Sequence, residues 1–236
     1  MLTRLAALAG ALVLVPTLAA CGASSSSSVA QDPAAASTPP SSAASSAGVT
    51  CDYPTDPQGS ARKVKAPPTT PTVSGTVRAR IATSVGNLQA TLDADKTPCT
   101  VNSFVSLAQQ GYFDNTPCHR LTTAATGIYV LQCGDPTGSG TGGPGYTIPD
   151  ELSGTETYGP GTLAMANTGQ PNSGGSQFFI VYKQTPLPPN YAVFGHISAA
   201  GVKIVQKVAA QGTDNAFGQG DGHPKTKVTV TGVTTG

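Results

Sequence analysis

Charged side chains are scarce in this sequence. Of 236 residues, 13 are Lys or Arg and 12 are Asp or Glu, so only 11% are charged and the formal net charge is +1. Domains that bind DNA or RNA carry clustered Lys and Arg residues that neutralise phosphates. No such basic stripe is present, and the sequence therefore argues against nucleic acid as a partner.

Residues that would hold a metal or a nucleotide are also missing. The three histidines, His119, His196 and His223, are dispersed and share no metal-ligand spacing. Strand alternation predicts that His119 faces the protein interior and forms a hydrogen bond there. The glycines between residues 138 and 143 spell GxGxxG, but a strand-like segment follows them, where a dinucleotide site requires a helix. We expect this stretch to be a loop, and we expect neither a metal nor a cofactor.

An apolar run occurs at the N-terminus but is too short for a stable membrane-spanning helix. Residues 1–20, MLTRLAALAGALVLVPTLAA, carry one charge, at Arg4, and have the layout of an export signal. Residues 18–21, LAAC, have the form of a lipobox, so the sequence resembles a bacterial lipoprotein precursor with a lipidated Cys21 as its mature N-terminus.

The lipoprotein resemblance implies a location. A diacylglyceryl group and an amide-linked acyl chain such as palmitate on Cys21 would anchor the protein stably. We therefore expect a membrane-anchored protein at the extracytoplasmic face of the cell membrane. The alternative is a simple secretory signal with an accidental cysteine, and in both cases the protein is exported.

Composition divides the rest of the chain into a linker and one domain. Residues 22–50 are nearly all Ser, Ala and Pro and cannot offset the entropy of ordering, which predicts a disordered tether. Residues 51–74 are rich in proline and are also predicted to be linker, extended and either free or lying against the domain. Together, residues 21–74 form the predicted linker, and residues 75–236 are long enough for a single folded domain.

Apolar periodicity predicts a mostly β domain with two helices. Period-2 alternation indicates a hairpin of residues 76–83 and 86–92, with a turn at Gly86 and Asn87. Apolar residues at helical spacing predict one helix after Thr97 that stops at Gly111, and a second helix over 200–211. Further strands are expected at 117–121, 129–132, 162–167, 177–182, 192–197 and 225–234. Eight strands and two helices suggest a closed β-barrel with helices at its ends.

The segment from 161 to 180, GTLAMANTGQPNSGGSQFFI, predicts two strands joined by a long glycine-rich bend. Ala166 and Asn167 lie at the end of the first strand, and Gln177 and Phe179 lie at the start of the second. These residues would line one groove with an amide, backbone groups and an aromatic ring. Such a groove is suited to a peptide.

Several segments together resemble one known family. They are CHR at 118–120, LQCGDPTGSGTGGPGYTIPDE at 131–151, GTLAMAN at 161–167, GGSQFFI at 174–180 and VFG at 193–195. They are similar, in the same order, to segments of cyclophilins, which are peptidyl-prolyl cis-trans isomerases. The resemblance implies a closed eight-stranded antiparallel β-barrel capped by two α-helices. It also implies an enzyme that accelerates rotation about Xaa-Pro bonds and assists the folding of exported proteins, with proline-containing peptides and unfolded exported proteins as its partners.

Rotation about an Xaa-Pro bond breaks no bond. The barrier of about 18–20 kcal/mol comes from amide resonance, so a catalyst needs a pocket for the proline ring and a donor that favours the twisted nitrogen. By resemblance, Arg120 is that donor, Gln132 holds it in place, and Phe179 is the floor of the proline pocket.

The resemblance also implies a set of substrate-binding residues. The pocket would have Tyr129 and Val130 as walls and Leu187 and Tyr191 at its rim. The peptide backbone would bind Ala166, Asn167, Thr168 and Gln177, and Gly140 would lie beside the residue before proline.

The sequence departs from the family pattern in this pocket. Many cyclophilins have Phe and Met where Tyr129 and Val130 stand, Trp where Pro186 stands, and His where Tyr191 stands, and TTAATG after Arg120 looks like a short insertion. The Pro186 difference implies weak cyclosporin binding. We expect the protein to be a monomer. The alternative function is a membrane-tethered module that binds proline-containing peptides, or a chaperone, without significant turnover.

Four cysteines follow Cys21. Cys51, Cys99, Cys118 and Cys133 are an even number in an exported chain, which allows two disulfides in three connectivities. Strand alternation places Cys118 on the same face as Arg120 and turns Cys133 to the face opposite Gln132. If those two strands pair, a bridge from Cys118 to Cys133 is disfavoured.

Overall fold

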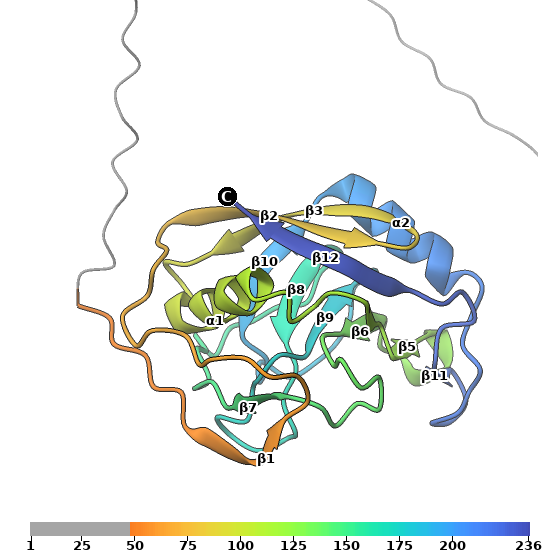
Figure 1. Ribbon diagram of the computed structural model, residues 1–236. Helices are drawn as coiled ribbons and strands as arrows, with labels where there is room; N and C mark the ends of the chain where they lie inside the picture. The colour runs from red at the N-terminus through yellow and green to blue at the C-terminus, as the bar shows by residue number, and fades with distance from the viewer. Residues whose placement is uncertain (1–47) are drawn as a thin grey trace, which may run out of the picture. The chain divides into compact units, whose positions relative to one another are not determined.

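A curled ten-stranded antiparallel sheet with two helices forms most of the domain (Figure 1). The computed structural model describes residues 48–236, so the predicted signal peptide, Cys21 and the linker up to residue 47 lie outside the described residues. The sheet order is β11-β5-β6-β9-β8-β10-β3-β2-β12-β4. Its strands are β2 (Thr76–Thr83), β3 (Gly86–Asp93), β4 (Thr116–Pro117), β5 (Arg120–Thr122), β6 (Val130–Cys133), β8 (Thr162–Met165), β9 (Phe178–Val181), β10 (Val193–Ile197), β11 (Asp221–Gly222) and β12 (Thr229–Thr235).

The predicted closed barrel of eight strands is wrong in its number of strands and in its closure. The sheet is open, with β11 and β4 at its two ends. The single strand predicted at 117–121 is divided into β4 and β5, because Cys118 and His119 lie between them outside any strand. β4 pairs with β12, whereas β5 pairs with β6 and β11, so these two consecutive strands belong to opposite ends of the sheet.

The predicted hairpin is confirmed as β2 and β3. All eight residues of each strand pair, from Thr76 with Asp93 to Thr83 with Gly86. Alternate residues of β2, beginning with Val77, are buried, while the residues between them are exposed or partly exposed. One face of this hairpin therefore covers the core and the other faces solvent.

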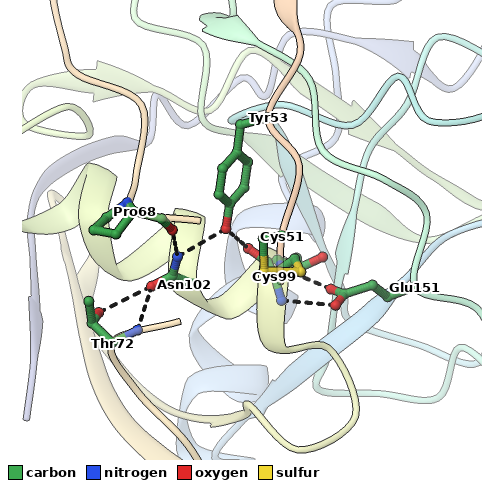
Figure 2. Close-up of a disulfide and its surroundings, with 8 residues drawn as sticks. Cys51, Tyr53, Pro68, Thr72, Cys99, Asn102 and Glu151 are labelled. Atoms are coloured by element: carbon green, nitrogen blue, oxygen red, sulfur yellow. Dashed lines mark hydrogen bonds between the residues drawn. A yellow bond between two sulfur atoms is a disulfide. The ribbon is translucent and has the colours of Figure 1, made fainter. Parts of the chain in front are cut away.

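Both predicted helices are present. α1 (Pro98–Gln109) has Thr97 at its N-cap position, but Thr97 makes no side-chain cap hydrogen bond. The Glu151 carboxylate accepts hydrogen bonds from the backbone nitrogens of Cys99 and Thr100 instead, each at 2.8 Å (Figure 2). A carboxylate at this end also interacts favourably with the helix dipole.

α2 (Ala199–Ala209) begins after Ser198, whose hydroxyl oxygen accepts a hydrogen bond from the backbone nitrogen of Gly201. Val205 and Val208 are buried on its inner face. α1 packs against β12 and β3, and α2 packs against β3. Among residues 48–236, neither helix is long and apolar enough to cross a membrane.

The main core lies inside the curl of the sheet. Aromatic rings from helix α1, from the segment after it and from the sheet pack there with centroid distances of 5.0–6.3 Å, namely Phe104, Tyr112, Phe113, Phe178 and Phe194. A second, smaller apolar cluster is separate from this core and contains Phe179, the neighbour of Phe178 on β9. Successive residues of a strand point to opposite faces, so β9 supplies one phenylalanine to each cluster.

Residues 51–74, which the sequence assigned to the linker, lie against the domain. β1 (Thr55–Ser60) pairs with β7 (Pro144–Tyr146) in a separate two-stranded sheet, seen below the main sheet in Figure 1. A disulfide joins Cys51 to Cys99 of α1. The structured region therefore begins well before the predicted boundary at Gly75, because a covalent bond and backbone pairing hold a segment that buries few apolar side chains of its own.

Candidate active site

Strand register brings the three predicted catalytic residues into one row. Arg120 of β5 pairs with Gln132 of β6, Gln132 pairs with Phe179 of β9, and Phe179 pairs with Ala164 of β8. Directly opposite residues of paired strands project from the same face of a sheet. Arg120 therefore lies one strand from Gln132 and two strands from Phe179 on that face.

Two nitrogens of Arg120 are bound to Asp221 of β11. Nε donates to Oδ1 at 2.8 Å and Nη2 donates to Oδ2 at 2.7 Å, while Nη1 is 3.5 Å from Oε1 of Gln132. This two-point pair fixes the plane of the guanidinium. The Arg120 side chain is 35% exposed. The hydrogen bonds to Asp221 raise the pKa of Arg120 further, so the group is a permanent cation that substrate can reach.

A chain of amide groups continues from Gln132 along the groove. Gln132 Nε2 donates to Oε1 of Gln177 at 2.9 Å. Gln177 Nε2 in turn donates to the carbonyl oxygens of Gly140 and Gly142, at 2.9 and 3.0 Å. These bonds orient both glutamines and connect β6 to the loop after it.

The loop that carries Gly140 is folded around one buried carboxylate. Asp135 accepts hydrogen bonds from the backbone nitrogens of Thr137, Gly140 and Gly142, at 2.8, 2.7 and 3.1 Å, and from the hydroxyl of Thr137. Burial alone would raise the pKa of Asp135, but these hydrogen bonds outweigh burial and hold its pKa below the usual range. The carboxylate is therefore ionised, and it shapes the loop that the sequence predicted.

The second apolar cluster contains Phe179 and therefore lies beside the row. Its buried members are Val130, Tyr158, Ala164, Phe179 and Val181, and Ala166, Leu187, Tyr191 and Val193 pack against them. Tyr191 meets Phe179 edge to face, with centroids 5.3 Å apart. Apolar side chains with a few fixed polar groups beside them are the usual lining of a small-ligand site, so this cluster is the candidate support for a proline ring.

Tyr129, in contrast, does not pack against this second cluster. Its ring packs edge to face on Tyr182 at 5.8 Å, and Lys183 Nζ lies 4.5 Å from its centroid. It belongs to the edge of the main core. The physical reason is that side chains alternate between the two faces of a strand. Val130 and Gln132 lie on the face of Phe179, so the Tyr129 side chain points to the opposite face.

The predicted backbone-binding residues lie at the other end of the groove. Asn167 Nδ2 donates to the carbonyl oxygen of Asn190 at 2.9 Å, and the backbone nitrogen of Thr168 donates to Oγ of Ser173 at 3.0 Å. Ala166 is held by a backbone bond to Gln177. Asn167 and Thr168 are accessible, and their side chains are oriented by neighbouring loops.

Two residues of the site were missed by the sequence analysis. Asp221 lies 101 residues from Arg120, so no local pattern joins them. Tyr158 lies outside any strand, and its hydroxyl accepts from the backbone nitrogen of Tyr191 and donates to its carbonyl oxygen, at 3.0 and 3.1 Å. The only sequence signal for Asp221 is an acidic residue in a glycine-rich turn, which is too common to be specific.

Two expectations about neighbouring residues are wrong. Cys118 and Cys133 form the disulfide that alternation disfavoured, because Cys118 lies outside strand β5 and its side chain turns into the core with Cys133. His119 is buried as predicted, but neither ring nitrogen has a hydrogen-bond partner within the described part of the chain. Burial lowers the pKa of His119, so the ring next to Arg120 is neutral.

Comparison with known proteins agrees with this geometry. A family model described as "Cyclophilin type peptidyl-prolyl cis-trans isomerase/CLD" matches residues 78–235. A protein of Mycobacterium tuberculosis named "Probable peptidyl-prolyl cis-trans isomerase B" is 48% identical over 200 residues, covering 79% of this chain and 64% of that protein. A Mycobacterium leprae protein of the same name is 48% identical over 198 residues, covering 78% and 65%. This chain thus spans just under two thirds of the length of these relatives.

Solved structures have the same fold. A crystal structure of a cyclophilin-type peptidyl-prolyl cis-trans isomerase of Cryptosporidium parvum, in the presence of the dipeptide Ala-Pro, has a TM-score of 0.57 and 29% identity, and the match covers 66% of this chain and 97% of that one. A second structure of the same enzyme has a TM-score of 0.59 at 29% identity and covers 68% of this chain and 98% of that one.

Proposed function

This chain belongs to the cyclophilin-type peptidyl-prolyl cis-trans isomerase family, and we propose that it is an active isomerase that accelerates rotation about Xaa-Pro bonds. The observation that carries the proposal is the position of Arg120, a fixed and accessible cation in the same row as Phe179 of the second apolar cluster. A proline ring on Phe179 would place its nitrogen near the guanidinium.

The proposed mechanism uses one preorganised donor. Rotation removes amide resonance, so the lone pair that the planar amide delocalises into the carbonyl becomes localised on the proline nitrogen. A donor aimed at that nitrogen binds the twisted state better than either ground state, which lowers the barrier. Arg120 is the donor, Asp221 and Gln132 orient it, and Phe179 supports the proline ring. Asn167 and Gln177 bind the peptide backbone.

The same proposal assigns substrate and location. The substrates are proline-containing peptides and unfolded exported proteins. The chain acts as a monomer anchored through a lipidated Cys21 at the extracytoplasmic face of the cell membrane, where it assists the folding of exported proteins. Cyclosporin is expected to bind weakly because Pro186 replaces a tryptophan common in the family.

The test is the isomerisation rate of a short Xaa-Pro peptide with the full chain and with Arg120→Ala. We expect kcat/KM to fall by about 10²–10³, the effect of losing one preorganised donor (about 2.7–4 kcal/mol). Arg80→Ala is a matched control, because Arg80 lies on β2, outside the row, and within residues 48–236 its side chain donates a hydrogen bond to Asn87 alone. The control variant should keep the parent rate.

Two results would contradict the proposal in different ways. An unchanged rate in Arg120→Ala would remove Arg120 from the mechanism. A parent chain that is folded and binds the peptide without accelerating its rotation would favour the alternative, a binding module, and the replacements at Val130 and Pro186 would then be examined first.

A further inference from the structure

The segment of residues 51–74, called here the N-terminal arm, lies outside the residues that the family model matches and is fixed to the domain at several points. Cys51 is bonded to Cys99 of α1, and the hydroxyl of Tyr53 donates to the carbonyl oxygen of Cys99 at 3.0 Å. Figure 2 shows both residues over the start of the helix.

A buried asparagine of α1 holds two further parts of the arm. Asn102 is fully buried, and its Nδ2 donates to the hydroxyl of Tyr53 at 3.0 Å and to the carbonyl oxygen of Pro68 at 2.9 Å. Its Oδ1 accepts from the backbone nitrogen of Thr72 at 3.0 Å (Figure 2). One side chain thus joins the start and the end of the arm to the domain.

The middle of the arm is paired with the loop that borders the candidate active site. β1 pairs with β7. The backbone nitrogen of Thr147 donates to the carbonyl oxygen of Pro54 at 2.9 Å, and the nitrogen of Ala61 donates to the carbonyl oxygen of Gly143 at 2.8 Å. The arm is therefore held on both sides of Asp56 and Gln58.

Asp56 and Gln58 line a second pocket next to the proposed proline pocket. The pocket has a volume of about 240 Å³, and its other walls include Gln132, Ala166, Asn167 and Gln177. All four of these residues belong to the predicted peptide groove. The arm thus contributes one wall of a cavity whose other walls are expected to contact substrate.

Asp56 gives this pocket a negative charge that nothing in the described residues neutralises. It is the only Asp, Glu, Lys or Arg among the residues that line the pocket. The salt bridges of residues 48–236 do not include it, and its one side-chain hydrogen bond is accepted from the backbone nitrogen of Gln58 at 2.9 Å. A Cβ atom at Gly143 would lie 3.9 Å from Asp56 Oδ2, so the carboxylate stands beside the glycine loop.

We propose that the N-terminal arm is part of the substrate groove and that Asp56 selects peptides with a Lys or Arg on the N-terminal side of the proline. The second pocket shares Gly140 and Gln177 with the groove, on the side predicted for residues before the proline. A cationic side chain entering it would meet Asp56 and the amide oxygen of Gln58. An acidic side chain would be repelled. This inference rests on the proposed peptide-binding function.

The test measures binding, so that it does not depend on catalysis. Fluorescent hexapeptides with one proline carry a single Lys or a single Glu placed one, two or three residues before it, and their Kd values are measured by polarisation with the full chain. At one of these positions we expect Lys to bind about two- to fivefold more tightly than Glu, the range of partly exposed ion pairs. Raising the salt to about 0.5 M should reduce this ratio, because it shortens the screening length.

Asp56→Asn keeps the size of the side chain and removes its charge, and it should bring the ratio of Kd values close to one. Asp52→Asn is the matched control, because Asp52 is an exposed acid of the same arm outside the pocket. The proposal is overturned if no position prefers Lys, if the preference survives in Asp56→Asn, or if Asp52→Asn removes it equally. Peptides that fail to bind a folded parent would overturn both proposals, whereas binding without isomerisation would overturn only the catalytic one.

Discussion

At the scale of single residues, the orientation of Arg120 depends mainly on Asp221. Two of the three guanidinium nitrogens are hydrogen-bonded to this carboxylate, and the bond to Gln132 is longer, at 3.5 Å. The pair leaves Nη1 on the side of Gln132, toward Phe179. Asp221 is 17% exposed at its side chain and would not contact substrate in the proposed mechanism, so its role is to position Arg120.

We therefore predict that Asp221→Ala lowers kcat by about 10- to 100-fold and changes KM less. The reason is that a misplaced donor weakens only the transition-state interaction, and small displacements cost about 10²-fold. Stopped-flow assays of the isomerisation of an Xaa-Pro peptide would measure kcat and KM. Asp221→Asn keeps an acceptor oxygen, so its kcat should fall less than that of Asp221→Ala. Asp214→Asn, an exposed acid that pairs with His223, serves as the control. Equal losses in all three variants would argue against a positioning role.

Asp135 links the stability of the fold to pH. Its carboxylate is buried, and its hydrogen bonds hold its pKa below that of an unfolded chain. A carboxyl group with a lowered folded pKa stabilises the folded protein at pH values above its unfolded pKa, about 3.9, and this contribution is lost as the pH falls through the folded pKa.

We predict that Asp135→Asn lowers the free energy of unfolding by about 2 kcal/mol at neutral pH, the scale of hydrogen bonds to a charged group. The difference from the parent should shrink as the pH falls from about 3.9 through the lower folded pKa, where the folded parent also loses its carboxylate. Urea unfolding at several pH values would measure it. A difference that stayed constant from neutral to acidic pH would contradict the assigned cause.

The site residues that could be predicted from sequence lie in short contiguous motifs. Arg120, Gln132 and Phe179 each belong to such a motif, and strand register brings them into one row. Asp221 could not be predicted, because its contact depends on how distant strands meet. Alternation over the predicted strand 129–132 already places the Tyr129 side chain on the face opposite Gln132, so it conflicts with the prediction that Tyr129 lines the proline pocket.

At the scale of elements, the two disulfides fix different parts of the molecule. The Cys118–Cys133 bond spans 15 residues and joins Cys118, two residues before Arg120 of β5, to Cys133, the last residue of β6, which also carries Gln132. The Cys51–Cys99 bond spans 48 residues and attaches the N-terminal arm to α1. In the chain-entropy description, a larger loop gives the larger stabilisation.

We predict that replacing Cys51 and Cys99 by Ala costs about 4 kcal/mol of unfolding free energy, and that replacing Cys118 and Cys133 costs about 3 kcal/mol. Their functional effects should also differ. Loss of the first bond should weaken the preference for Lys over Glu near the proline, while loss of the second should lower kcat. Denaturant unfolding and peptide kinetics on both double variants would measure this, and identical functional profiles would count against the separation.

The elements that were predicted correctly carry a strong periodic signal. The β2–β3 hairpin alternates over its whole length, and both helices have apolar residues at helical spacing. The strands that were missed, β1, β7 and β11, have two to six residues and contain Pro or Gly. Such strands are defined by their partners in the fold, and no local pattern identifies them.

At the scale of the whole molecule, the two ends of the open sheet are connected by the chain itself and are not hydrogen-bonded to each other. β4 and β5 lie at opposite ends of the strand order yet are separated by two residues only, Cys118 and His119. The chain therefore passes from one end of the sheet to the other beside Arg120. The count of eight strands predicted from sequence assumed one unbroken strand here, and the side chains of Cys118 and His119 instead turn into the interior.

The last prediction concerns where the molecule resides, and it depends on Cys21, which lies outside the described residues. A cysteine with two or more acyl chains holds a protein stably on a membrane, whereas an unmodified mature chain of this composition has no such anchor. We predict that Cys21→Ser moves the protein from the membrane fraction to the soluble exported fraction of a bacterial host. Fractionation and mass spectrometry of the N-terminal peptide would measure both location and acylation. Because Cys21 is far in sequence from the proposed site, isomerase activity per molecule should not change. Equal release of the parent and the variant would instead support a simple secretory signal.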